Sequence, residues 1–112
     1  MSFKLGLHFE AVGRAFLEGK GFKIIESNYY TRYGEIDIIA MKDDVLHFIE
    51  VKYSKSDPYR KFSKAKMSRV IKSALLYLQD KELDNNFCID ALAIHNEKIN
   101  LYENLSFGGS YH

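Results

Sequence analysis

The sequence predicts a single α/β domain in which helices flank a mixed β-sheet. The chain has 112 residues, a length that suits one domain, and 46% of them are hydrophobic, which is enough to bury a core. Amphipathic helical patterns alternate with short runs of β-branched and aromatic residues, in the order α-β-β-β-α-β-β. We expect residues 1–105 to form the domain and residues 106–112 to form a flexible tail.

The first helix is expected over residues 4–20. Its apolar residues recur at offsets of four, three and four: Leu5, Phe9, Val12 and Phe16. This spacing lines one face of a helix, which would pack on the sheet. Gly21 is the expected left-handed residue that ends the helix, and a β-like segment rich in Ile, Tyr and Phe follows over residues 22–30.

The second and third strands are expected within residues 33–53, on either side of Asp43 and Asp44. Two turn-forming residues between apolar runs are typical of a β-hairpin. In a two-residue turn, Lys42 faces Val45, and the numbers of every facing pair add to 87. This register fixes which side chains share each face of the hairpin.

A polar loop is expected over residues 54–61, followed by a second helix from its N-cap Ser63 to about Leu83. The apolar residues at helical spacing predict its buried stripe: Met67, Val70, Ile71, Ala74, Leu75 and Leu78. Two further strands are expected over residues 87–95 and 98–102. The second helix would cross over between the hairpin and these strands.

Charged residues are concentrated in the predicted hairpin. In the expected register, Asp37 faces Glu50 and Glu35 faces Lys52, all on one face of the sheet. Facing carboxylates destabilise a hairpin unless a positive charge lies between them. A divalent cation would supply that charge, and an oxygen-only ligand set is the kind that Mg²⁺ or Mn²⁺ accepts. The alternative is a solvated charge ladder in which Glu35 pairs with Lys52.

The near-neutral composition hides a basic segment. The chain carries a net charge of +1, but residues 52–72 contain eight Lys or Arg and one acid, which leaves −6 for the rest. A uniformly basic nucleic-acid binder is therefore excluded. The segment is either a solvated helix face or a track for the phosphate backbone of DNA. The residues expected to contact DNA are Lys55, Arg60, Lys61, Lys66, Arg69 and Lys72.

The number of cysteines and the length of the apolar runs exclude other classes of protein. The single cysteine, Cys88, rules out a disulfide within the chain and a zinc site with several thiolates, and it suits a reducing cytoplasm. No apolar run approaches the roughly 20 residues of a membrane-spanning helix, so we expect no membrane partner. We expect Cys88 to be a small buried hydrophobe. The histidines His8, His47 and His95 are expected to have structural or surface roles.

The arrangement of Asp37, a 12-residue gap, Glu50 and Lys52 resembles the metal-binding core of the PD-(D/E)xK nuclease superfamily. Further motifs extend the likeness: Glu10, Lys20-Gly21-Phe22, Asn28, Gly34-Glu35-Ile36-Asp37, Lys66, Arg69, Ala74, Tyr77, Leu78 and Asp90. With these, residues 6–103 resemble the YraN-type family of small bacterial proteins. Members of that family are predicted to have a restriction-endonuclease-like fold related to archaeal Holliday-junction resolvases.

The resemblance implies a restriction-endonuclease-like fold and a metal-dependent endonuclease that hydrolyses phosphodiester bonds in DNA. It implies that Asp37 and Glu50 bind Mg²⁺ or Mn²⁺ together with the carbonyl of Val51. Glu10 would reach the metal from the first helix, directly or through water. Lys52 would position the attacking water or stabilise charge on the phosphate. Without the resemblance, Glu10 is an ordinary helix glutamate beside an apolar stripe.

Three functions are compatible with these residues. The nuclease is favoured because both acids and the lysine are present. The alternative is a catalytically silent nucleic-acid-binding module of the same fold, acting in a repair or uptake complex. The third is a structural interaction domain with a coincidental charge ladder. Glu35 could assist the metal or only pair with Lys52. A homodimer would supply two active sites for branched or recombination-intermediate DNA, an expectation that rests on analogy between folds.

Overall fold

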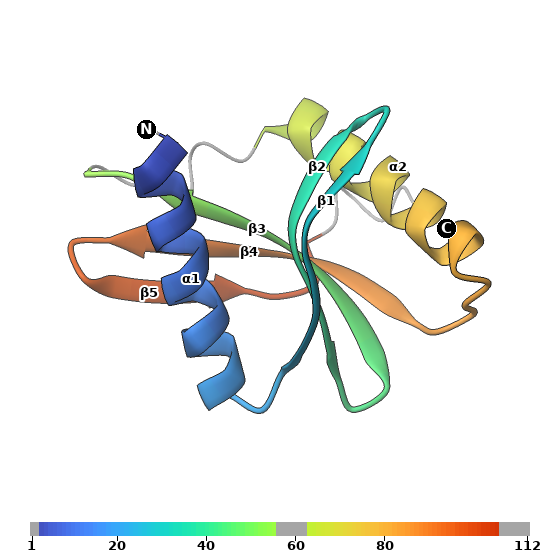
Figure 1. Ribbon diagram of the computed structural model, residues 1–112, viewed down its shortest axis with the longest axis horizontal. Helices are drawn as coiled ribbons and strands as arrows, with labels where there is room; N and C mark the ends of the chain where they lie inside the picture. Colours follow the sequence, from blue (N-terminus) through green and yellow to red (C-terminus); the bar gives the residue numbers. More distant parts are fainter. Residues whose placement is uncertain (1–2, 56–62, 106–112) are drawn as a thin grey trace.

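The structure, a computed structural model, describes residues 3–55 and 63–105 of the chain (Figure 1). Within these residues it has two helices and five strands, and their order confirms the predicted mixed α/β class. The elements are α1 Phe3–Gly19, β1 Lys23–Thr31, β2 Gly34–Lys42, β3 Val45–Tyr53, α2 Lys64–Asp80, β4 Phe87–His95 and β5 Lys98–Tyr102. The predicted tail, residues 106–112, lies outside the described residues, as do Arg60 and Lys61.

The five strands of the described chain form one sheet in the order β1-β2-β3-β4-β5. The β3–β4 pair is parallel and the other described pairs are antiparallel, which makes the sheet mixed. α2 connects β3 to β4, and a helical crossover of this kind is what two parallel neighbours require. The parallel register runs from Leu46 opposite Phe87 to Tyr53 opposite Ile94.

The predicted hairpin turn is confirmed. β2 and β3 pair from Lys42–Val45 to Ile38–Ile49, in the register expected for a two-residue turn. Asp43 and Asp44 have φ angles of 51° and 65°. Positive values at both positions are those of a type I′ turn, whose twist matches that of the flanking strands. Aspartate tolerates this region better than most residues with a Cβ atom.

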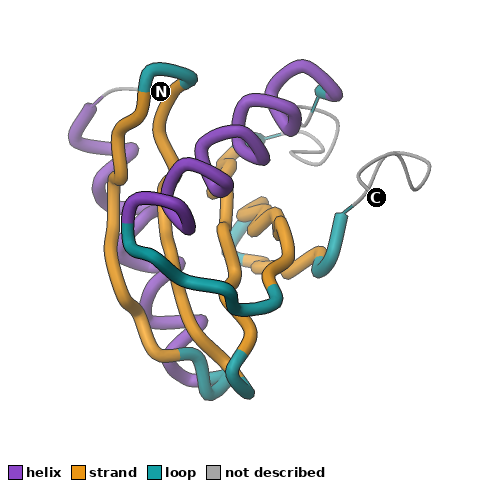
Figure 2. Tube along the Cα trace, turned by 90° about the vertical axis from the view of Figure 1, so that its right-hand side faces the viewer, coloured by secondary structure: helices purple, strands orange, loops and turns teal. Residues whose placement is uncertain are grey.

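The two helices cover opposite faces of the sheet, as Figures 1 and 2 show. Strand residues alternate between the faces, so that Phe48 packs with α2 whereas Ile49 belongs to the core on the α1 side. Ser63 caps α2 as predicted, because its side chain accepts the backbone N–H of Lys66 at 3.1 Å. Neither described helix has the length and apolarity needed to cross a lipid bilayer.

Two residues assigned to the buried helix faces are exposed. Leu75 is 51% exposed because Ala74 and Tyr77 occupy the face of α2 toward the sheet, and Leu75 is turned about 100° from Ala74. Leu5 is 39% exposed and lies near the start of α1. The fully buried Leu17 lies near the other end of this helix, where it packs in the core. The remaining predicted core residues of α2 are buried or packed against the core.

Gly13 lets α1 approach the sheet closely. A Cβ atom at this position would lie 2.8 Å from Cδ2 of Leu92, which is fully buried in β4. Nearby, the ring of Phe9 stacks on that of Tyr53 at the end of β3, with centroids 3.9 Å apart. Glu10 lies three residues before Gly13 and therefore on the same side of α1. The close packing of α1 thus brings Glu10 to the sheet.

We expect Gly13→Ala to lower the free energy of unfolding by about 1 kcal/mol, because the cost of overpacking exceeds the gain in helix propensity. Gly19 is the matched control, since no atom lies within 4 Å of a Cβ placed there. Gly19→Ala should leave stability unchanged or raise it by up to about 1 kcal/mol. Urea unfolding measures both variants, and equal stabilities would contradict the close contact of α1 with β4.

Candidate functional site

The acidic residues of the hairpin line a cavity of about 300 Å³. Residues of α1, β2, β3 and α2 surround it. Its ionisable lining residues are Glu10, Glu35, Asp37, Glu50, Lys52, Lys66 and Arg69, together with Tyr33. The four residues to which the resemblance assigns catalytic roles therefore share one space, although they come from three separate elements.

β2 and β3 diverge where the acids begin. The paired segment ends at Ile38 and Ile49, and in Figure 1 β2 curves away from β3 beyond this point. The expected facing pairs, Asp37 with Glu50 and Glu35 with Lys52, are therefore not part of the ladder.

The side chain of Asp37 bridges the two strands where their backbone pairing has ended. Its Oδ2 accepts the backbone N–H of Val51 at 2.8 Å. This bond takes the place of a backbone bond between the strands and satisfies a donor that the divergence would leave unpaired. Asp37 therefore shapes the cavity as well as lining it.

The carboxyl group of Asp37 is unusually basic. Burial is the largest cause that raises its pKa to about 9, followed by the charge of Glu50. The N–H of Val51 acts in the opposite direction but is outweighed. With this pKa, Asp37 holds a proton at neutral pH unless a cation lies beside it.

Glu50 has one carboxylate oxygen paired and one unpaired. Its Oε1 lies 2.9 Å from Nζ of Lys66. Within residues 3–55 and 63–105, its buried Oε2 has no hydrogen-bond partner. A buried carboxylate oxygen without a partner is costly. A bound cation would satisfy it.

The two lysines of the cavity differ in basicity. Burial lowers the pKa of Lys52, and the neighbouring Lys66 lowers it further. Burial alone would also lower the pKa of Lys66, but the carboxylate of Glu50 and its hydrogen bonds raise it overall. Lys66 is therefore a fixed positive partner of Glu50, while Lys52 gives up its proton more readily. The sequence predicted Lys66 only as a DNA contact, and its ion pair places it inside the site.

Asn28 is singled out in the sequence only as a motif of the family resemblance, and the structure shows its contacts with the acids of the site. Its Nδ2 donates to Oε1 of Glu10 and to Oε1 of Glu35, each at 2.8 Å. It lies between the β1–β2 pairs Ser27–Ile38 and Tyr29–Ile36, yet its φ is 53°. A positive φ inside a strand costs of order 1–3 kcal/mol and is typical of functional sites.

The contact with Asn28 also clarifies Glu35, which accepts the amide of Asn28 and is not in the ladder opposite Lys52. Carboxylate oxygens of Glu10, Glu35 and Asp37 lie within 4.8 Å of one another. These three form an oxygen-only donor set, which suits Mg²⁺ or Mn²⁺; Glu50 lines the same cavity but is not in this group of close oxygens. Val51 contacts Asp37 through its N–H, and the role of its carbonyl stays a prediction.

The basic residues of α2 extend from the cavity. Lys66 and Arg69 line it, and Lys72 follows three residues later on the surface of the same helix. Nζ of Lys72 lies 5.5 Å from the ring centroid of Tyr33, which also lines the cavity. Lys55 is exposed beyond the end of β3. Lys66, Arg69 and Lys72 thus place positive charge on the α2 side of the cavity.

Comparisons with other proteins place the chain in a family. A model described as "Uncharacterised protein family UPF0102" matches residues 9–94, which include the four predicted catalytic residues. A UPF0102 protein of Helicobacter pylori (strain P12) is 44% identical over 103 residues, covering 91% of this chain and 90% of the relative. A UPF0102 protein of Wolinella succinogenes is 43% identical over 107 residues, covering 95% and 99%. One of Campylobacter hominis is 39% identical over 107 residues, covering 93% and 95%. The chain therefore belongs to the uncharacterised protein family UPF0102.

Proposed function

We propose that this protein is a Mg²⁺- or Mn²⁺-dependent endonuclease that hydrolyses phosphodiester bonds in DNA. The observation that carries the proposal is the buried Oε2 of Glu50, which has no partner among the described residues, in a cavity that also holds Asp37 with its raised pKa. A bound divalent cation would stabilise both carboxyl groups. It would give Oε2 a partner and would favour the charged form of Asp37.

The donor set fits a hard cation. Asp37, Glu50 and Glu10 would hold it, with the carbonyl of Val51 as a further oxygen ligand, since all four residues line the cavity. Glu35 would assist, because its carboxylate lies within 4.8 Å of those of Glu10 and Asp37. When bound, such an ion polarises a phosphoryl oxygen and lowers the pKa of a coordinated water.

The protein's own residues position the reacting groups. The side chain of Lys52 lines the same cavity, and burial lowers the pKa of its amine below that of an ordinary lysine. It would orient the attacking water or stabilise charge that develops on the phosphate. Lys66 keeps the Glu50 carboxylate in place through their ion pair. Asn28 holds Glu10 and Glu35 through the hydrogen bonds that its amide donates to them.

The substrate is argued from the positive charge on the α2 side of the cavity. Arg69 lines the cavity and Lys72 follows on α2, and Lys55 lies beyond β3. Positive side chains at the rim of an acidic site favour a polyanion whose phosphate enters the site. DNA fits this chemistry, and branched DNA is one form of the substrate to be tested.

Cleavage of duplex, flapped and four-way-junction DNA with Mg²⁺ or Mn²⁺ tests the activity. We expect wild type to nick at least one of these substrates, and Asp37→Ala and Lys52→Ala each to lose at least about 100-fold in rate. Lys98→Ala removes an exposed lysine of β5 away from the cavity and should cleave normally. Wild type that binds DNA but nicks none of the substrates would overturn the enzyme and leave the binding module.

The raised pKa of Asp37 predicts how pH affects stability without metal. The pKa is about 9 in the folded protein and near its ordinary value of 3.8 when unfolded. Between these values the folded state binds the extra proton, so the free energy of unfolding falls as pH rises through this window. The charged groups around Asp37 come from α1, β2, β3 and α2: Glu10, Glu35, Glu50, Lys52 and Lys66.

Urea unfolding between about pH 5 and pH 8.5 in the presence of a chelator measures this dependence. Asp37→Asn is isosteric and cannot ionise, so its stability should fall less with rising pH than that of wild type. Mn²⁺ should stabilise wild type more at the upper end of the range, because the ion competes with the proton on Asp37. Parallel pH profiles for wild type and Asp37→Asn would show that Asp37 does not titrate as described.

Asn28 can be tested with two variants that differ in backbone freedom. Asn28→Ala and Asn28→Gly both remove the amide that holds Glu10 and Glu35, and we expect each to weaken Mn²⁺ binding about 10- to 100-fold. Glycine adopts the φ of 53° without strain, so Asn28→Gly should be more stable than Asn28→Ala by about 1 kcal/mol. Calorimetry measures the affinity of each variant for Mn²⁺. If Asn28→Gly binds Mn²⁺ as tightly as wild type, Asn28 does not position Glu10 and Glu35 for the ion.

A further inference from the structure

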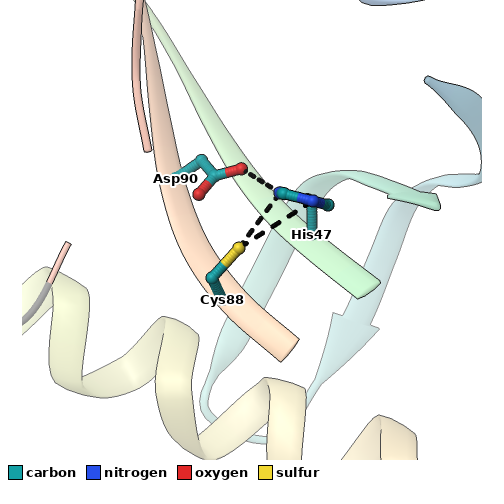
Figure 3. A group of neighbouring side chains, drawn as sticks. All are labelled: His47, Cys88 and Asp90. Carbon is teal, nitrogen blue, oxygen red and sulfur yellow. Dashed lines mark hydrogen bonds and ion pairs between the residues drawn. The ribbon is translucent and has the colours of Figure 1, made fainter. Parts of the chain in front are cut away.

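A second group of ionisable side chains lies outside the cavity described above. His47 of β3 faces Cys88 in the parallel register with β4, and Asp90 is the next residue on the same face of β4. Figure 3 shows the three side chains pointing toward one another. In the part of the chain that the structure describes, none of them lines the acidic cavity.

Their contacts converge on one ring nitrogen. Nδ1 of His47 lies 2.6 Å from Oδ2 of Asp90 and 3.0 Å from Sγ of Cys88. Nδ1 carries at most one proton, so it cannot donate fully to both neighbours. Asp90 is completely buried, and its Oδ1 accepts the backbone N–H of Asn104 at 2.9 Å. The imidazole, thiol and carboxyl groups are thus held together on two rigid strands.

We propose that His47, Cys88 and Asp90 form a zinc site. Sulfur, nitrogen and oxygen donors in one cluster match the ligands that Zn²⁺ takes in proteins, whereas Mg²⁺ and Mn²⁺ prefer oxygen alone. On binding, the thiol proton is released to solvent, and the proton between Nδ1 of His47 and Oδ2 of Asp90 moves to Nε2 of the imidazole, so that Nδ1 can coordinate the ion. The thiolate and the carboxylate then carry two negative charges, which the ion balances in a buried place. The site differs in chemistry from the oxygen-only cavity and does not depend on the proposed nuclease.

The geometry requires a small adjustment. Zinc bonds of about 2.0–2.3 Å in a tetrahedron separate the donor atoms by roughly 3.3–3.6 Å. The donors already lie within 4.8 Å of one another. To reach that range, the separation of 2.6 Å between His47 and Asp90 needs to widen by about 0.7–1.0 Å, and that of 3.0 Å between His47 and Cys88 by about 0.3–0.6 Å. Cys88 is only partly buried, so it has room to move and the fourth position can take a water molecule.

The same cluster does not suit a nucleophilic cysteine. Burial is the main cause that raises the pKa of the Cys88 thiol to about 12, and the charge of Asp90 adds to it. A thiol in this environment is inert at neutral pH. Binding a cation is the chemistry that would convert it to a thiolate, because the metal's charge favours the ionised form.

Titration of the full chain with Co²⁺ tests the site. We expect thiolate-to-cobalt charge-transfer absorption that saturates at one equivalent and disappears when Zn²⁺ is added. Cys88 is the only cysteine of the sequence, so any such band reports this residue. Cys88→Ser should abolish the band, and Asp37→Asn should keep it, which separates this site from the acidic cavity.

Two histidine variants complete the test. His47→Gln should weaken Zn²⁺ binding at least about 10-fold and remove the rise in Tm that Zn²⁺ causes in wild type. His95→Gln is the control, because Nδ1 of His95 contacts the carbonyl of Ser54 and not this cluster. Circular dichroism checks that each variant folds, and Asp90→Asn replaces His47→Gln if the latter does not. Folded wild type without the band, or saturation at half an equivalent, would overturn a zinc site within one chain.

Discussion

The burial of Asp37 and Glu50 beside each other is the constraint on which the rest of the structure depends. Two carboxyl groups that share a buried space cannot both ionise without a positive partner. The protein meets this constraint with the proton on Asp37, the bond from the N–H of Val51 to its carboxylate, and the ion pair of Lys66 with Glu50. The same bond bridges β2 and β3 where their backbone pairing has ended, and both of its residues line the cavity.

Residues from both sides of the sheet complete this arrangement. Gly13 allows α1 to lie close to β4, which brings Glu10 to the acids, and α2 supplies Lys66 from the opposite face. Asn28 links Glu10 to Glu35 at the expense of a strained backbone within β1. Strain that is held at one residue by its surroundings is typical of a preorganised site. The fold therefore stabilises a group of charges that would be unfavourable if considered alone.

β3 pairs with β2 on one side and with β4 on the other, and different side chains gather at each pairing. The pairing of β3 with β2 ends at Ile49, and beyond this point carboxyl groups of both strands line the cavity. Toward β4 the parallel pairing continues, and it holds His47 level with Cys88 in a tightly packed cluster. A hard cation suits the first set of donors and zinc suits the second. β3 thus lies between a group of oxygen donors on its β2 side and a group of mixed sulfur, nitrogen and oxygen donors on its β4 side.

The sequence alone determined the order of the elements, the two-residue hairpin turn and most of the helix faces, because these depend on local periodicity and turn chemistry. It also identified Glu35, Asp37, Glu50 and Lys52, because charged side chains between the apolar residues of a hairpin are costly, whereas Glu10 was identified only by the family resemblance. Only the tertiary structure decided that Asp37 bonds to Val51, that Lys66 pairs with Glu50, and that Asn28 joins two glutamates. These contacts join elements far apart in the chain, and their geometry depends on how the strands diverge and how closely α1 packs.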